Sequence, residues 1–126
     1  MHHLGISTMV ENIKKVIDMD DPIPPNVVIR GSKCVNIVKF KEDEFEPLFK
    51  ELAVEVRKHD KRCNYYDLYR SEQPRTYIVM EQYEDKEALQ MHQKSEHGQN
   101  YFPKLRERIE KMEVSYYVCV SSLKTI

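Results

Sequence analysis

The sequence is poor in the residues that build phosphate-binding loops and membrane spans. Only three glycines occur among 126 residues, so no Gly-rich loop is present to hold the phosphates of a nucleotide. No apolar run approaches the roughly 20 residues that a membrane-spanning helix needs. The amino terminus also lacks the uninterrupted apolar segment of a secretory signal. These absences predict a protein that neither spans a membrane nor binds a dinucleotide.

Net charge is almost absent as well. Twenty basic residues balance 21 acidic residues, which gives a formal net charge of −1, and the charges are spread along the chain. Nucleic acids and anionic lipid surfaces attract proteins through clustered positive charge. We therefore expect neither nucleic acid nor a membrane as a partner.

The cysteines are few and odd in number. Cys34, Cys63 and Cys119 are widely spaced, and each lies inside or beside a predicted strand. This usage suits reduced thiols that pack as small apolar side chains, rather than a disulfide framework. We expect a cytoplasmic protein without a structural zinc ion.

Residues 1–32 are predicted to form an amino-terminal helix followed by a proline-rich linker. Thr8 and Glu11 have the spacing of a capping box, and apolar residues then recur at helical spacing to about residue 18. Three prolines between residues 22 and 25 end this helix and stiffen a linker that runs to about Ser32. The domain proper is then expected to span residues 33–126.

Within that domain the pattern predicts four strands and two main helical regions. The strands are expected at 34–40, 63–70, 76–83 and 114–121, where β-branched and aromatic residues alternate with others. Helical spacing is seen from 43 to 58, again from 85 to 92, and in a last helix whose apolar stripe extends from Tyr101 to Ile109 and Met112. The order β-α-β-β-α-β predicts an α+β, ferredoxin-like domain with helices on one face of an antiparallel sheet.

The segment from Glu81 to Tyr101 contains the best candidate site. Glu81 and Tyr83 share one face of a predicted strand, and the apolar period then changes from strand to helix. His92 lies three and four residues beyond two apolar helix positions, so its imidazole is expected at the edge of a buried surface. A buried histidine with a purely structural hydrogen bond remains the alternative.

The spacing of these residues resembles the signature of the antibiotic biosynthesis monooxygenase family over roughly residues 33–121. The matching positions are Glu81, Tyr83, Ala88, Leu89, His92, Ser95, His97 and Tyr101. The resemblance implies a small ferredoxin-like protein that forms a homodimeric α+β barrel. All of the eight tyrosines except Tyr101 lie in predicted strands, so a second copy would cover the helix-free face of the sheet.

The resemblance also implies a small-molecule substrate. Some members of that family are cofactor-independent monooxygenases of quinols or polycyclic phenols, which need only an apolar pocket, a base and hydrogen-bond donors. His92 is then the candidate base, Glu81 would orient it, and Asn36 would hold the substrate oxygen. Tyr66, Tyr83, Tyr101 and His97 are the candidate substrate-binding residues.

Two other functions remain open. An isomerase of a small phosphorylated sugar would need basic residues such as Arg70 or Lys39 near its pocket, and a non-catalytic ligand-binding or regulatory dimer would use the same residues for packing. If these residues have structural rather than catalytic roles, Asn36 completes hydrogen bonds in the sheet, and Glu81 pairs with Lys or Arg at the dimer interface.

Cofactors are not expected. The chain has no tryptophan, and Phe102 stands where the haem-degrading members that it resembles carry a haem-binding histidine. Ser95, just before Glu96, is expected to cap the second helix at a break between the two helices. His92 and His97 are five residues apart, a spacing that does not put two imidazoles on one helical face. We therefore expect neither haem nor a bound metal ion.

Overall fold

The computed structural model describes residues 24–123, and the predicted helix near Thr8 lies outside them. Among the described residues, no helix is both long and apolar enough to cross a membrane. The elements in chain order are β1 (Val27–Ile37), α2 (Glu42–His59), β2 (Cys63–Arg70), β3 (Thr76–Tyr83), α3 (Lys86–Lys94), α4 (Glu96–Arg106) and β4 (Ile109–Leu123).

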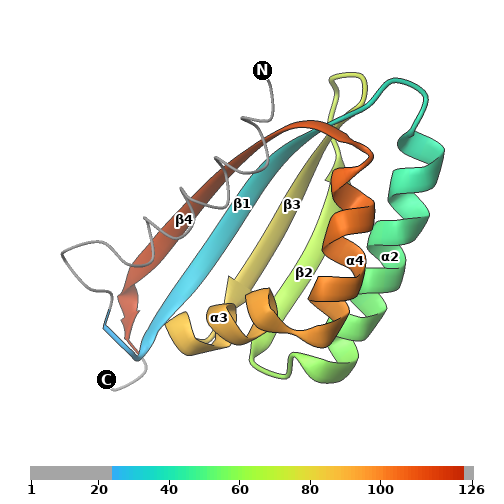
Figure 1. Ribbon diagram of the computed structural model, residues 1–126. Coiled ribbons are helices and arrows are strands. Elements are labelled where there is room, and N and C mark those ends of the chain that lie inside the picture. Colours follow the sequence, from blue (N-terminus) through green and yellow to red (C-terminus); the bar gives the residue numbers. More distant parts are fainter. Residues whose placement is uncertain (1–23, 124–126) are drawn as a thin grey trace.

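The strands form one antiparallel sheet in the order β2-β3-β1-β4. Helices α2 and α4 lie side by side over one face, and α3 lies near one end of the sheet (Figure 1). The opposite face carries no helix of the described part of the chain. This arrangement confirms the predicted α+β, ferredoxin-like domain. The two helical stretches predicted after the third strand are the separate helices α3 and α4.

The first strand begins earlier than predicted. β1 starts at Val27 rather than at Cys34, so residues 27–32, expected to be linker, are part of the strand. Val27 pairs with β4, and residues 29–32 pair with both β3 and β4. The polar residues Arg30 and Ser32 interrupt the apolar run and hid the strand, although Val27 and Ile29 are fully buried on the helix side. At its other end the strand stops at Ile37, three residues before the predicted end.

The last helix is shorter than predicted. α4 ends at Arg106, and Ile109 and Met112 belong to β4, where they pair with Ile37 and Val35 of β1. Their spacing fits the apolar stripe of a helix, but from Met112 onward apolar residues occur at every second position, which also fits a strand. Pairing with the central strand β1 decides between these two patterns, because backbone groups buried against the core need partners.

A break separates α3 from α4. Ser95 has extended backbone angles (φ −63°, ψ 153°), and its Oγ accepts a hydrogen bond from the backbone N–H of Gly98 at 3.0 Å. The same hydroxyl donates to the carbonyl of His92 at 2.7 Å. The prediction that Ser95 caps the second of these helices is therefore confirmed. The chain changes direction between His92 and His97, which sets where the two imidazoles point.

The core divides into two clusters on the helix side of the sheet. Strand tyrosines point to both faces: Tyr66, Tyr77, Tyr83 and Tyr116 toward the helix side, and Tyr65, Tyr69 and Tyr117 away from it. The smaller cluster lies beneath α3, and the larger one lies between α2, α4 and the sheet. Buried members of the larger cluster are Val35, Ile37, Phe45, Phe49, Leu52, Ala53, Val56, Tyr66, Tyr77, Val79 and Leu105.

Replacing Ser95 with alanine tests how much the helix break contributes to stability. Ser95→Ala removes one acceptor from the first turn of α4 and one donor from the last turn of α3, so we expect the free energy of unfolding to fall by about 1 kcal/mol. Denaturant unfolding measures this loss. Glu72→Ala, at an exposed position of the loop between β2 and β3, is the control and should change stability by less than about 0.5 kcal/mol. Equal effects of both changes would contradict a stabilising cap.

Candidate functional site

His92 is the central residue of the site. It extends from α3 into the protein interior, where its side chain is 2 % exposed. Its Nδ1 lies 2.8 Å from Oδ2 of Asp60. The rings of Tyr66, Tyr83 and Phe102 surround it, with centroids at 5.0, 5.4 and 5.7 Å. The prediction of a buried imidazole at this point is confirmed.

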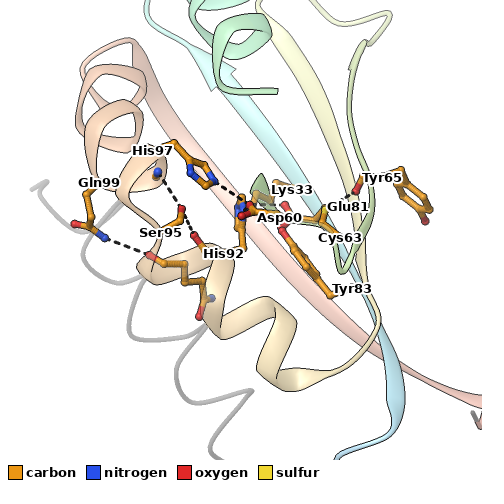
Figure 2. Close-up of polar contacts among 12 residues, drawn as sticks. Lys33, Asp60, Cys63, Tyr65, Glu81, Tyr83, His92, Ser95, His97 and Gln99 are labelled. Atoms are coloured by element: carbon orange, nitrogen blue, oxygen red, sulfur yellow. Dashed lines mark hydrogen bonds and ion pairs between the residues drawn. The ribbon is translucent and has the colours of Figure 1, made fainter. Parts of the chain in front are cut away.

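Asp60 holds two histidines at once. It follows the last residue of α2, and its Oδ2 lies 3.0 Å from Nε2 of His97 as well as close to His92 (Figure 2). Burial alone would raise the pKa of Asp60, but the hydrogen bonds from the two imidazoles outweigh it and lower that pKa. An ionised carboxylate only accepts hydrogen bonds, so both ring nitrogens must donate to it.

This arrangement assigns the tautomer of His92. A neutral imidazole that carries its proton on Nδ1 presents a lone pair at Nε2. The Nε2 atom is buried and has no hydrogen-bond partner among the described residues. Leaving a buried polar atom without a hydrogen-bond partner costs free energy. In the neutral ring of His92 this atom is Nε2, which can accept a proton.

Beside the imidazole lies a second buried polar group. Glu81 is completely buried, its Oε1 accepts a 2.5 Å hydrogen bond from the Tyr83 hydroxyl, and its Oε2 lies 3.0 Å from Nζ of Lys33. Burial opposes ionisation of Glu81, yet the charge of Lys33 and the tyrosine hydrogen bond lower its pKa. The same ion pair raises the pKa of Lys33 against the effect of burial. Both groups are therefore charged.

Room for Glu81 comes from a glycine on the neighbouring strand. Gly31 of β1 pairs with Glu81 of β3. A Cβ atom at Gly31 would lie 2.9 Å from Cγ of Glu81 and 2.9 Å from the ring of Tyr116. Such distances are below ordinary van der Waals contact, so a side chain at position 31 would displace the carboxylate or the ring.

Of the predicted site residues, Glu81, Tyr66 and Tyr83 do lie together with His92. The role expected of Glu81, however, belongs to Asp60, which is the carboxylate that contacts the His92 ring. Glu81 instead pairs with a lysine of its own chain. Two carboxylates therefore lie in this region, Asp60 in contact with Nδ1 of His92 and Glu81 paired with that lysine.

Asn36 is not brought to this site. Its amide donates to Oγ1 of Thr76 at 2.9 Å. The strand alternation places Asn36 on the helix-free face, opposite the face of Lys33 and Glu81, and five residues along β1 from the partner of Glu81. Its observed contact is the hydrogen bond within the sheet that was the alternative interpretation.

His97 and Tyr101 lie on the outer side of the same region. The hydroxyl of Tyr101 donates to Oε1 of Glu51 at 3.1 Å, and the His97 ring stacks on that of His59 at 5.5 Å. Both residues, with Asp60, line a solvent-open depression of about 730 Å³. Tyr66 and Tyr83, in contrast, are buried and contact the ring of His92.

A second depression lies between α2 and β2. Its volume is about 710 Å³, and aromatic rings of Phe49, Tyr66 and Tyr77 line it. Tyr66 stacks on Phe49 at 5.1 Å, and its ring also contacts His92. Neither depression is lined by His92 or Glu81, so Tyr66 separates this outer space from the buried base.

Sequence reasoning missed Lys33 and Asp60. Lys33 lay just before the predicted start of the first strand, although its place in the alternation of Ile29, Gly31 and Val35 would have shown a charge on a buried face. Asp60 comes directly after His59 at the end of a predicted helix, where solvated side chains are expected. His59 fits this expectation, with its side chain 58 % exposed, but Asp60 does not, at 11 %. No local signal distinguishes the two.

Removing one member of the Lys33–Glu81 pair should destabilise the protein strongly. Lys33→Met or Glu81→Gln leaves the other residue buried without its partner, which costs about 3 kcal/mol of unfolding free energy. The double variant leaves no unpaired charge and should recover most of that loss. Denaturant unfolding of all four proteins gives the coupling.

Lys41→Met is the matched control, because Lys41 forms an exposed pair with Glu44. It should cost less than about 1 kcal/mol. Additive losses in the double variant would show that Lys33 and Glu81 do not depend on each other.

Comparison with known proteins places this architecture in a family. A model of the family described as antibiotic biosynthesis monooxygenase matches residues 36–104, more than half of the chain. None of the curated proteins matches the sequence.

Several solved structures share the fold. A protein from Caulobacter crescentus CB15, proposed to be an antibiotic biosynthesis monooxygenase, is 23 % identical, with a TM-score of 0.73 over 76 % of this chain and 92 % of that one. A conserved protein from Methanosarcina mazei Go1 is 29 % identical, with a TM-score of 0.67 over 73 % of this chain and 92 % of that one. With the family model, they confirm the resemblance seen in the sequence: the chain belongs to the antibiotic biosynthesis monooxygenase family.

Proposed function

We propose that the protein is a cofactor-independent monooxygenase of a small, electron-rich phenol or quinol, and that His92 removes the phenolic proton. The observation that carries this proposal is the environment of His92. Asp60 accepts from its Nδ1, and the buried Nε2 has no hydrogen-bond partner among the described residues. This is the arrangement of a general base whose second nitrogen is oriented by a carboxylate.

The chemistry needs no external reductant. Transfer of the phenolic proton to Nε2 of His92 gives a phenolate, which is electron-rich enough to pass an electron to oxygen. A quinol and O₂ then yield a hydroxyquinone and water: one oxygen atom replaces a ring hydrogen, the other leaves as water, and all the electrons come from the quinol. The Asp60 carboxylate would stabilise the imidazolium that forms during proton transfer.

The depression between α2 and β2 supports an aromatic substrate. Phe49, Tyr66 and Tyr77 line it, and offset stacking on such rings favours planar aromatic molecules. Access to His92 from this space requires the Tyr66 ring to move, because that ring lies between the depression and the imidazole. Tyr66 is therefore the substrate-contacting residue in this proposal.

A sugar phosphate fits this space less well. Arg70, the basic residue expected to hold a phosphate, is occupied by Glu46, whose two carboxylate oxygens lie 3.0 and 2.8 Å from its Nη2. Binding a phosphate there would require breaking that pair. This contact favours the oxygenase over the isomerase as the function to test first.

Oxygen uptake by the chelator-treated protein with a series of hydroquinones tests the proposal. For a hydroquinone that the wild-type protein oxidises faster than the uncatalysed reaction, His92→Gln should lower kcat by about 100-fold or more, because it removes the base. His59→Gln is the matched control at an exposed position and should retain the wild-type rate. Unchanged turnover by a folded His92→Gln protein, or no uptake with any hydroquinone, would contradict the proposed role.

We further propose that a second copy of the chain covers the helix-free face of the sheet. This face carries Tyr69 and Tyr117, which are 53 % and 56 % exposed, together with the partly buried Tyr65, Ile78 and Met80. Exposed apolar surface of this kind marks an interaction site, and the equivalent face of another copy offers the same tyrosines to pack against.

Solution mass at micromolar concentration tests this assembly. We expect twice the chain mass of 15.1 kDa. Tyr69→Asp with Tyr117→Asp should shift the protein to monomer, because both would bury charge between the copies. Val54→Asp, at an exposed apolar position of α2, should leave the mass unchanged. A wild-type monomer would rule out the dimer.

The cellular location is part of the same proposal. Cys34, Cys63 and Cys119 form no disulfide, and burial raises the pKa of the Cys63 thiol to about 12. Thiols in this state suit a reducing compartment. We therefore propose that the protein works in the cytoplasm.

A further inference from the structure

We propose that Asp60, His92 and His97 form a binding site for one divalent first-row transition metal ion, of the class of zinc or cobalt. A ligand atom from each residue lies within 4.8 Å of the other two. The three residues come from the end of α2, from α3 and from α4 (Figure 2). Two imidazoles and a carboxylate are a ligand set typical of these ions.

The distances are close to those of a metal centre. Oδ2 of Asp60 lies 2.8 Å from Nδ1 of His92 and 3.0 Å from Nε2 of His97. In a tetrahedral site with bonds of about 2.0 Å, neighbouring ligand atoms are about 3.3 Å apart. Each imidazole nitrogen therefore needs to move away from Oδ2 by only a few tenths of an ångström, and the two nitrogens already lie within 4.8 Å of each other. Side-chain rotation can supply adjustments of this size. The ion would replace the two protons that now join the imidazoles to the carboxylate.

Access and a further coordination position are also present. Asp60 and His97 line the solvent-open depression of about 730 Å³, so an ion can enter from that side, and water can complete its coordination. His59 and Glu55 line the same depression, where His59 stacks on His97. The three ligands are 10–11 % exposed or less, which limits competition from bulk water.

On one continuous helix, a spacing of five residues would point the two histidines apart. The break at Ser95 changes this, because α4 starts in a new direction and turns His97 back toward the residue that also contacts His92. Ser95 holds the turn through hydrogen bonds to Gly98 and to the carbonyl of His92. The ligands are thus positioned before an ion binds, which reduces the ordering cost of binding.

Metal binding would have a consequence for His92, which rests on the proposed function. An ion on Nδ1 leaves a neutral imidazole with its proton on Nε2, and that nitrogen then has no lone pair to accept a phenolic proton. Bound metal and catalysis by His92 therefore exclude each other. The metal-free protein is the active one, and zinc should inhibit oxygen uptake until a chelator removes it.

The first experiment measures binding without any substrate. The full chain, freed of metal with a chelator, is titrated with zinc chloride by calorimetry and with cobalt chloride by visible absorption. We expect one ion per chain with a dissociation constant in the micromolar range or below, and cobalt bands typical of tetrahedral coordination. His97→Gln and Asp60→Asn should each weaken binding by at least about tenfold.

Controls separate this site from other histidines. A variant with His2→Ala and His3→Ala should bind as the wild type does, since this adjacent pair could otherwise bind metal by itself. His59→Gln should also bind normally. Circular dichroism and thermal unfolding without metal show whether each variant is folded, and added zinc should raise the Tm of the wild type but not that of His97→Gln.

Three results would overturn the site. The first is no binding at millimolar metal, and the second is binding lost with the His2 and His3 changes. The third is folded His97→Gln and Asp60→Asn proteins that bind as tightly as the wild type. Loss of binding in His59→Gln alone would overturn the choice of ligands. Failure of the oxygenase proposal would leave these binding measurements unaffected, because they contain no quinol.

Discussion

The site depends on one carboxylate that two imidazoles share. Asp60 is ionised because His92 and His97 both donate to it, and this requires a proton on Nδ1 of His92 and on Nε2 of His97. In the neutral ring of His92 this leaves the lone pair on the buried Nε2, among aromatic rings. The position of the carboxylate at the end of α2 thus determines which atom of a residue on α3 is available for chemistry.

A second carboxylate, Glu81, is buried in the same region as Asp60 but has different partners. Glu81 and Lys33 neutralise each other across β3 and β1, and Tyr83 completes the hydrogen bonding of the carboxylate. Burial normally favours the neutral forms of such groups. Here both stay charged, because the attraction between the two charges replaces the hydration that each lost on burial. The carboxylate that motif reasoning linked to the base is therefore part of a separate pair, and the base has its own carboxylate partner.

The two ring nitrogens of His92 have different environments, and this links the two proposals. Nε2 is buried and suits proton removal from a phenol, whereas Nδ1 contacts Asp60, which together with His97 lines the solvent-open depression. A proton at Nδ1 makes Nε2 a base, and a metal ion at Nδ1 makes Nε2 a donor. One imidazole can therefore have two states with opposite chemical roles, selected by whatever occupies its outer side.

Local patterns in the sequence determined most of the fold. Alternation identified β2 and β3 to the residue, helical spacing identified α2, and the cap at Ser95 was predicted from its position before Glu96. Patterns with two solutions needed tertiary pairing: Ile109 and Met112 fit both a helix and a strand, and residues 27–32 became a strand only because β3 and β4 lie on both sides.

The residues of the site show the same division. His92, Glu81, Tyr66 and Tyr83 could be chosen from period and motif, since each follows its neighbours in the chain. Asp60 and Lys33 could not, because their partners are 32 and 48 residues away. Only the tertiary structure, which places the end of α2 beside His92 of α3 and pairs β1 with β3, brings those charges together.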